Sequence, residues 1–218
     1  MTITQHAAFE VAAVTVLPAL REPSSMDEAN HRVANSLQLT AALVSIAARR
    51  ITDPAALAVL DTTTRRIAAI AGVHRQLYRQ RSVGGVDLGG YLEDLGADLE
   101  TSCGDADAGR HVRVAADRVV VTPEVATSIG VIVSELVGNA CKYAYPSGHP
   151  GDVEVSLRDA PRGGFVLEVA DQGRGRIAGA APEGSGLGTE LVAMMARRLG
   201  AQHRWHDARP GTRFTLCV

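Results

Sequence analysis

The sequence predicts an α+β protein in which an N-terminal antiparallel helical hairpin precedes a domain of mixed helices and strands. Two observations predict this class. Apolar side chains recur at steps of three and four through residues 24–83, which is typical of amphipathic helices. After Gly84-Gly85, strand-like runs alternate with helical stretches. We therefore divide the chain into a leader at 1–23, a hairpin at 24–83 and a second domain at 84–218.

The composition excludes several classes of protein. The 218 residues carry a formal net charge of -2, so no global basic field attracts nucleic acid. The 3 cysteines show neither CxxC nor Cys/His spacing, which argues against a disulfide framework or a zinc site. The apolar run at 11–20 is shorter than the roughly 20 residues of a membrane span and lacks the flanks of a signal peptide. We therefore expect a cytoplasmic protein with no nucleic-acid or membrane partner.

Both helices of the hairpin have a start signal and one apolar stripe. Ser24 and Ser25 offer an N-cap after Pro23, and Pro54 suits the first turn of the second helix. The first stripe comprises Val33, Leu37, Thr40, Val44, Ala47 and Ile51. The second comprises Leu57, Leu60, Thr64, Ile67, Ala71, His74 and Leu77. Two helices cannot enclose both stripes, so we predict that two copies pair in a dimeric four-helix bundle.

The elements of the second domain follow from changes in periodicity. Helices are predicted near 87–100, at 123 to about 143, and at 187–199. Strands are predicted at 111–115, 153–157, 165–170, 202–206 and 212–218. A glycine-rich loop follows the strand at 165–170.

Polar residues of this domain suit a nucleotide. Glu135 and Asn139 lie four residues apart on the long helix and therefore face the same side, and the amide oxygen of Asn139 is a hard ligand suited to magnesium. Asp171 ends a strand, where its carboxylate can accept a hydrogen bond from an exocyclic amine. Gly173 and Gly175 allow close approach to the base. These residue types predict selection of adenine.

The run Gly186-Leu187-Gly188 opens the helix at 187–199, where free backbone N–H groups form a phosphate cradle. With the two stretches above, it resembles the N, G1 and G2 boxes of the GHKL ATPase superfamily, over about residues 120–218. The resemblance implies a Bergerat α/β sandwich with a mixed sheet that binds ATP and magnesium.

The same resemblance implies individual roles. Asn139 is the magnesium ligand and Asp171 reads the adenine. Lys142 contacts phosphate, Tyr143 stacks on the base, and Thr212, in a final glycine box with Gly211, is a secondary adenine contact.

A second polar cluster lies on the first hairpin helix. Glu28, His31, Asn35 and Gln38 step by three and four and form one ridge. His31 is two residues from Val33, about 200° around the helix, so it points away from the apolar stripe and should be exposed. A neutral imidazole in that position is an accessible nucleophile.

Residues 30–38 resemble the phosphoacceptor box of HisKA_2-class histidine kinases. The resemblance implies that His31 takes the γ-phosphate of ATP and passes it to an aspartate of a response regulator receiver domain. Arg32 replaces the acidic residue that follows the histidine in the commonest class, so Glu28 and Glu135 are both candidates to accept the proton. Tyr143, in place of the N-box histidine of the HWE class, favours HisKA_2.

The predicted function is thus an ATP-dependent histidine autokinase that acts as a homodimer. A separate sensory protein is a further candidate partner, because the leader at 1–23 is too short for an ordinary sensor domain. The alternative is an ATP-independent histidine phosphotransfer protein with a degenerate catalytic domain, which the short lid at 176–183 and the lack of an input domain favour. An anti-sigma-type serine kinase would leave the His31 helix unexplained.

Overall fold

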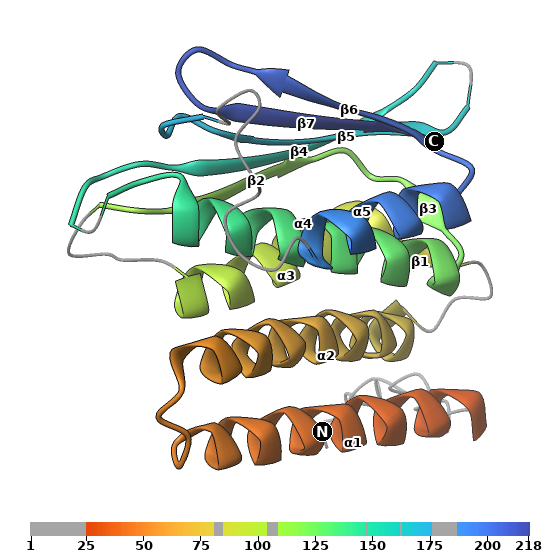
Figure 1. The fold of residues 1–218 in the computed structure, drawn as a ribbon. Helices are drawn as coiled ribbons and strands as arrows, with labels where there is room; N and C mark the ends of the chain where they lie inside the picture. The colour runs from red at the N-terminus through yellow and green to blue at the C-terminus, as the bar shows by residue number, and fades with distance from the viewer. Residues whose placement is uncertain (1–24, 81–84, 104–108, 147, 162, 176–186) are drawn as a thin grey trace, which may run out of the picture.

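A computed structural model describes residues 25–80, 85–103, 109–146, 148–161, 163–175 and 187–218. The predictions for the leader, for Ser24, for the lid at 176–183 and for Gly186 lie outside the described residues. In the rest of the chain, a helical hairpin packs against a domain of helices and strands, which confirms the predicted fold class (Figure 1).

The hairpin consists of α1 (Ser25–Ala48) and α2 (Pro54–Gln80), which lie antiparallel (Figure 1). Asp53 begins the second helix, because its carboxylate accepts a hydrogen bond from the backbone N–H of Ala55 at 3.0 Å. Pro54 then occupies the first helical position, where the missing N–H costs no hydrogen bond. The local sequence therefore accounts for both the break between the helices and the start of α2.

The stripe that α1 buries differs from the predicted one. Val33 is 41% exposed, and Thr40 and Ala47 are exposed as well. The buried or half-buried positions of α1 are Asn30, Ala34, Leu37, Ala41, Val44 and Ala48. The prediction favoured large apolar side chains, whereas the observed stripe uses alanines, whose small size permits close helix packing, and one polar contact between Asn30 and His74. The predicted α2 stripe is half-buried or buried throughout.

The second domain begins with β1 (Val86–Asp87), α3 (Leu88–Cys103), β2 (Val112–Ala116), β3 (Val120–Val121) and α4 (Pro123–Tyr143). It continues with β4 (Val153–Asp159), β5 (Phe165–Asp171), α5 (Leu187–Arg198), β6 (Gln202–Asp207) and β7 (Thr212–Cys217). The main sheet has the order β2-β4-β5-β7-β6, with β2 parallel to β4 and the other pairs antiparallel, so it is mixed as expected. The short β1–β3 ladder was not predicted, because two-residue strands show no periodicity.

Helices α3, α4 and α5 cover one face of the sheet, and α2 lies beyond them with α1 outermost (Figure 1). The central helix is α4, which Thr122 caps by accepting from the N–H of Val125. Among the described helices, only α4 has the length and hydropathy of a membrane span, and 72% of that stretch is buried inside the protein. Its apolar composition thus follows from its place in the core.

The C-terminal half of α2 belongs to the same hydrophobic core as this domain. Ala69 and Val73 are fully buried there, and the hydroxyl of Tyr91 on α3 donates to the Ala69 carbonyl at 2.9 Å. Burial raises the pKa of Tyr91, so this hydroxyl stays a neutral donor. A Cβ on Gly130 of α4 would lie 1.8 Å from the Tyr91 oxygen, so only glycine admits the ring. Tyr91 therefore ties α2 to α3 and α4.

Candidate functional site

The predicted adenine end of the site is built around Asp171, the last residue of β5. Its Oδ1 accepts hydrogen bonds from the backbone N–H groups of Gly173 at 2.9 Å and Thr212 at 3.3 Å. Burial raises the pKa of Asp171, and these two hydrogen bonds act against that shift. Both bonds go to one oxygen, which leaves the other carboxylate oxygen as the candidate acceptor of a hydrogen bond from an exocyclic amine.

The glycines near Asp171 have a structural role that the sequence did not reveal. A Cβ on Gly173 would lie 2.2 Å from the carbonyl oxygen of Ala144, and one on Gly211 would lie 1.8 Å from that of Asp171. Gly211 also has a φ of 98°, and Gly175 one of 72°. The glycine boxes therefore hold backbone segments against each other, and in that way shape the loop that carries the Asp171 carboxylate.

The predicted phosphate end brings together α4 and the start of α5. A Cβ on Gly188 would lie 2.9 Å from Oε2 of Glu135 and 3.5 Å from Nδ2 of Asn139. Leu187 and Gly188 begin α5, and the N–H groups of its first turn have no partner within the helix. The structure thus places the side chains of Glu135 and Asn139 against the N-terminus of α5, where the sequence predicts a phosphate cradle.

The donors at this end suit magnesium. An amide oxygen and a carboxylate beside a phosphate cradle are hard ligands, and magnesium is usually held by one or two such groups together with water and phosphate oxygens. Within the described residues, no three His, Cys, Asp or Glu side chains form a metal cage. Asn139 and Glu135 therefore fit a metal ion that arrives with the nucleotide.

Two predicted site residues contact the hairpin instead of open space. Nζ of Lys142 lies 2.9 Å from Oδ2 of Asp61 on α2. Nε of Arg66, also on α2, donates to Oε1 of Glu135 at 2.6 Å, and Glu135 is only 3% exposed. The sequence analysis did not include Asp61 and Arg66 among the site residues. Their charge was a signal, because charged side chains in the middle of a helix that packs on the core need polar partners.

The predicted base-stacking residue, Tyr143, ends α4 and is 36% exposed. Its carbonyl oxygen accepts a hydrogen bond from Nε of Arg174, in the loop after Asp171. This contact holds the end of α4 beside the loop that follows Asp171.

The predicted phosphoacceptor ridge lies on the exposed surface of α1. Glu28, His31 and Asn35 are all exposed, which confirms the prediction for His31. Nδ2 of Asn35 lies 3.5 Å from Nδ1 of His31, and Glu28 forms an ion pair with Arg32 at 2.5 Å. Because α1 packs on α2, and α2 in turn on α4, the structure does not bring His31 to the nucleotide residues (Figure 1).

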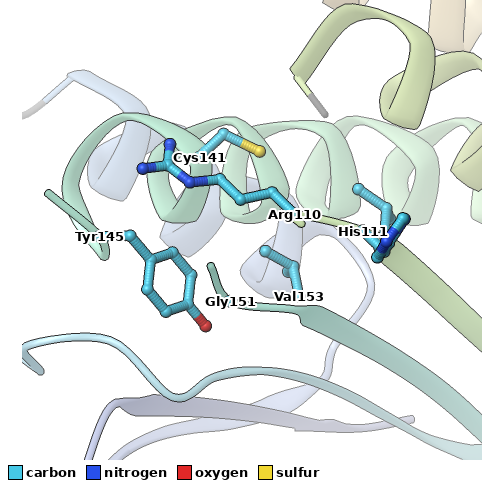
Figure 2. Close-up of a pocket in the computed structure, with 7 residues that line it drawn as sticks. Arg110, His111, Cys141, Tyr145, Gly151 and Val153 are labelled. Carbon is cyan, nitrogen blue, oxygen red and sulfur yellow. The ribbon is translucent and has the colours of Figure 1, made fainter. Parts of the chain in front are cut away.

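A small cavity lies near the C-terminal end of α4 (Figure 2). Its volume is about 10 Å³, room for a single water molecule. It is lined by Arg110, His111, Val112, Cys141, Tyr145, Gly151 and Val153. The Tyr145 hydroxyl accepts from the N–H of Gln172 at 2.9 Å and donates to the Asp152 carbonyl at 2.7 Å, so this region braces the loop after Asp171 rather than receiving a nucleotide.

The mixed sheet, the N-box side chains and the glycine boxes together define a GHKL-type nucleotide domain preceded by a helical hairpin. Residues 28–103 match the HisKA_2 histidine kinase family model, and residues 105–217 match the model of the histidine kinase-like ATPase domain. The chain therefore belongs to the histidine kinase family, of the HisKA_2 class.

Several relatives are sensor kinases. The chain is 30% identical over 206 residues to sensor histidine kinase PdtaS of Mycobacterium tuberculosis, covering 91% of this chain and 40% of PdtaS. It is 28% identical over 186 residues to blue-light-activated histidine kinase 2 of Erythrobacter litoralis, covering 80% of this chain and 51% of that protein. The chain thus spans about half the length of these relatives or less.

Solved structures share the fold. The histidine kinase domain of the Erythrobacter litoralis EL346 blue-light activated histidine kinase superposes with a TM-score of 0.66 at 21% identity, covering 88% of this chain and 93% of that chain. A longer structure of the same kinase superposes with a TM-score of 0.68 at 23% identity, covering 91% of this chain and 61% of that one.

Proposed function

We propose that the chain is an ATP-dependent, homodimeric histidine autokinase of two-component signalling. It transfers the ATP γ-phosphate to His31 and then to an aspartate of a response regulator receiver domain. The observation that carries the proposal is that one chain combines an exposed His31 on a hairpin helix with a convergent cluster of Glu135, Asn139 and Gly188. A separate sensory protein would supply the input, and we expect the protein to act in the cytoplasm.

At the adenine end, the second oxygen of Asp171 accepts a hydrogen bond from the exocyclic amine, while Thr212 lines the same edge. Tyr143 stacks on the base. The phosphates bind at the N-terminus of α5, to the backbone N–H groups of Gly186, Leu187 and Gly188. Lys142 adds a cation. Asn139, with Glu135 beside it, holds magnesium, which neutralises charge on the phosphates.

At the phosphoacceptor end, a ring nitrogen of His31 attacks the γ-phosphorus as the bond to the ADP oxygen breaks. The contact from Asn35 at 3.5 Å orients the ring. The proton that His31 loses passes to Glu28, three residues away on the same ridge, or to Glu135. In the described conformation Glu28 is paired with Arg32 and Glu135 with Arg66, so either carboxylate must leave its partner first.

An exposed apolar face supports the homodimer. On α1, Leu39, Leu43 and Ile46 are 63%, 57% and 55% exposed, and they lie on the side of the helix opposite the stripe that packs on α2. Val59 of α2 is 55% exposed as well. A contiguous apolar face of this kind indicates a protein interface, and a second copy would complete a four-helix bundle.

Labelling with γ-labelled ATP tests the proposal. The wild-type chain should acquire acid-labile label that His31→Ala abolishes, whereas the matched change His206→Ala, at an exposed histidine of β6, should keep it. Label that persists in His31→Ala would exclude His31 as the acceptor. If calorimetry detects no ATP binding while the chain still accepts phosphate from a phosphorylated receiver domain, the ATP-independent phosphotransfer alternative holds instead.

A further inference from the structure

The middle of α2 makes two ion pairs with α4, and both involve side chains that the proposed ATP site uses. Arg66 binds Glu135 at 2.6 Å, and Asp61 binds Lys142 at 2.9 Å. The signs are opposite: α2 offers a cation to the carboxylate beside the magnesium ligand and an anion to the phosphate-binding lysine. We call Asp61, Arg65 and Arg66, with the α4 residues that they contact, the α2 latch.

The latch fits one face of α4 closely. Glu135, Gly138 and Lys142 are spaced at i, i+3 and i+7, so they share that face. A Cβ on Gly138 would lie 2.8 Å from Nη2 of Arg65, so the guanidinium lies close against the α4 backbone at this position. Arg65 in turn donates to Asp61, which therefore binds two cations at once.

The charge of Asp61 is held by these contacts. Burial tends to raise the pKa of Asp61, but hydrogen bonds from Lys142 and Arg65 outweigh it and keep the pKa below its ordinary value. The carboxylate is therefore ionised at neutral pH and available for both pairs.

The two halves of α2 are held in different ways. From Ala69 to Val73 the helix is anchored by apolar burial and by the Tyr91 hydrogen bond. Around Asp61 to Arg66 it is joined to α4 by the two ion pairs, and Nε of Arg65 is buried without a hydrogen-bond partner in the described part of the chain. An unsatisfied buried donor disfavours the closed arrangement. The charged half can therefore open while the apolar half stays in place.

We propose that the α2 latch and MgATP compete for Glu135 and Lys142, so that nucleotide binding opens the latch. The proposal rests on the ATP-binding function proposed above. With nucleotide in place, Arg66 would face the like charge of magnesium and Asp61 the like charge of the phosphates. Both α2 side chains are then repelled from the positions where the closed state holds them.

Opening has a consequence for transfer. In the closed arrangement α2 lies between His31 and the nucleotide domain, and it also occupies two of the side chains that bind the nucleotide (Figure 1). Release of the charged half of α2 frees the hairpin to change its angle to α4. The latch thereby couples nucleotide occupancy to the relative position of phosphoacceptor and phosphate donor, and linkage requires that opening the latch strengthens nucleotide binding.

Calorimetry on the full chain, with magnesium and a non-hydrolysable ATP analogue, tests this coupling. The double variant Asp61→Asn/Arg66→Gln should bind about three- to tenfold more tightly, because the Asp61–Lys142 pair and the Arg66–Glu135 pair no longer compete with the nucleotide. Arg75→Gln is the matched control, because Arg75 joins α2 to Asp98 of α3 at 3.0 Å without touching a nucleotide residue, and its affinity should not change. Unchanged or weaker binding in the double variant overturns the latch.

The single variant Asp61→Asn provides a second test in case the double variant does not fold, because Asp61 is half-exposed and its substitution should leave the fold intact. It should bind the analogue about twofold more tightly than the wild type. Hydrogen exchange adds a second readout. The analogue should speed exchange of amides at 57–66 but not at 69–77. A wild-type chain that binds no analogue refutes the proposed function itself, whereas one that binds it without faster exchange at 57–66 refutes only the latch.

Discussion

Helix α1 and the nucleotide domain carry their candidate chemistry in opposite environments. On α1, His31, Asn35 and Glu28 are exposed, with Asn35 beside the His31 ring and Glu28 paired with Arg32 on the same helix. In the nucleotide domain, Glu135 is buried, Asp171 accepts backbone hydrogen bonds from Gly173 and Thr212, and Gly188 lies close against the side chains of Glu135 and Asn139. Substitutions at these exposed α1 positions should therefore change function without changing stability, whereas substitutions in the nucleotide domain should usually change both.

The strongest test of this separation is His31→Ala. We expect complete loss of phosphohistidine with a change in unfolding free energy of no more than about 0.5 kcal/mol, because surface side chains contribute little to stability. ATP affinity should also stay at the wild-type value. Thermal denaturation and calorimetry on the same sample check both points, and a markedly lower Tm would show that His31 has a structural role.

The next largest effect concerns the apolar face of α1. Ile46→Asp should convert the dimer to a monomer, which light scattering measures. A twofold interface loses this apolar side chain from both copies, and each loss removes about 1.5–3 kcal/mol of burial free energy. Val120→Asp is the matched control, since Val120 on β3 is also 55% exposed but lies in the nucleotide domain. If both variants stay dimeric, the apolar face of α1 is not the dimer interface.

Gly211→Ala should destabilise the nucleotide domain by about 2–5 kcal/mol, from a left-handed φ together with a backbone clash. Gly163→Ala separates these two causes. Gly163 has a φ of 89° but nothing within 4 Å of an added Cβ, so only the backbone strain of about 1–2 kcal/mol applies. Urea denaturation measures both variants, and equal losses would mean that the contact of Gly211 with Asp171 has no energetic weight.

Asp171→Asn should weaken ATP binding about tenfold or more, since a hydrogen bond to a charged acceptor contributes about 1.5–3 kcal/mol. Stability should not fall, because the Asn oxygen can still accept from Gly173 and Thr212, and the buried charge is removed. A substantially lower Tm for this variant would argue that the ionised form of Asp171 stabilises the fold.

The pH dependence of the wild type provides an independent check of Asp171. Burial raises its pKa above the ordinary value of 3.8, so its contribution to stability is fully present below that pH and is lost as pH rises through the folded-state pKa. ATP affinity should follow the opposite course and weaken as pH falls through the same pKa. Asp171→Asn should remove both dependences, which calorimetry across acidic pH would detect.

Local signals predicted much of this molecule. The bounds of α4 were predictable because Thr122 and Pro123 form an N-terminal signal and a continuous apolar stretch follows. The shared face of Glu135 and Asn139 was predictable from their spacing on one helix. The stripe of α1 was not, because Ala34 and Ala41 pack better than their hydrophobicity suggests, and because Asn30 has a partner on another helix.

The sequence by itself determined the order of elements and the nucleotide motifs, since these depend on spacings within single helices and loops. Only the tertiary structure decided that the middle of α2 places Asp61 and Arg66 on Lys142 and Glu135. Those pairs join residues about seventy or more positions apart, and their geometry depends on how α2 packs across α4. No local periodicity encodes that packing, because it results from the burial of Ala69 and Val73 in a core shared by the two regions.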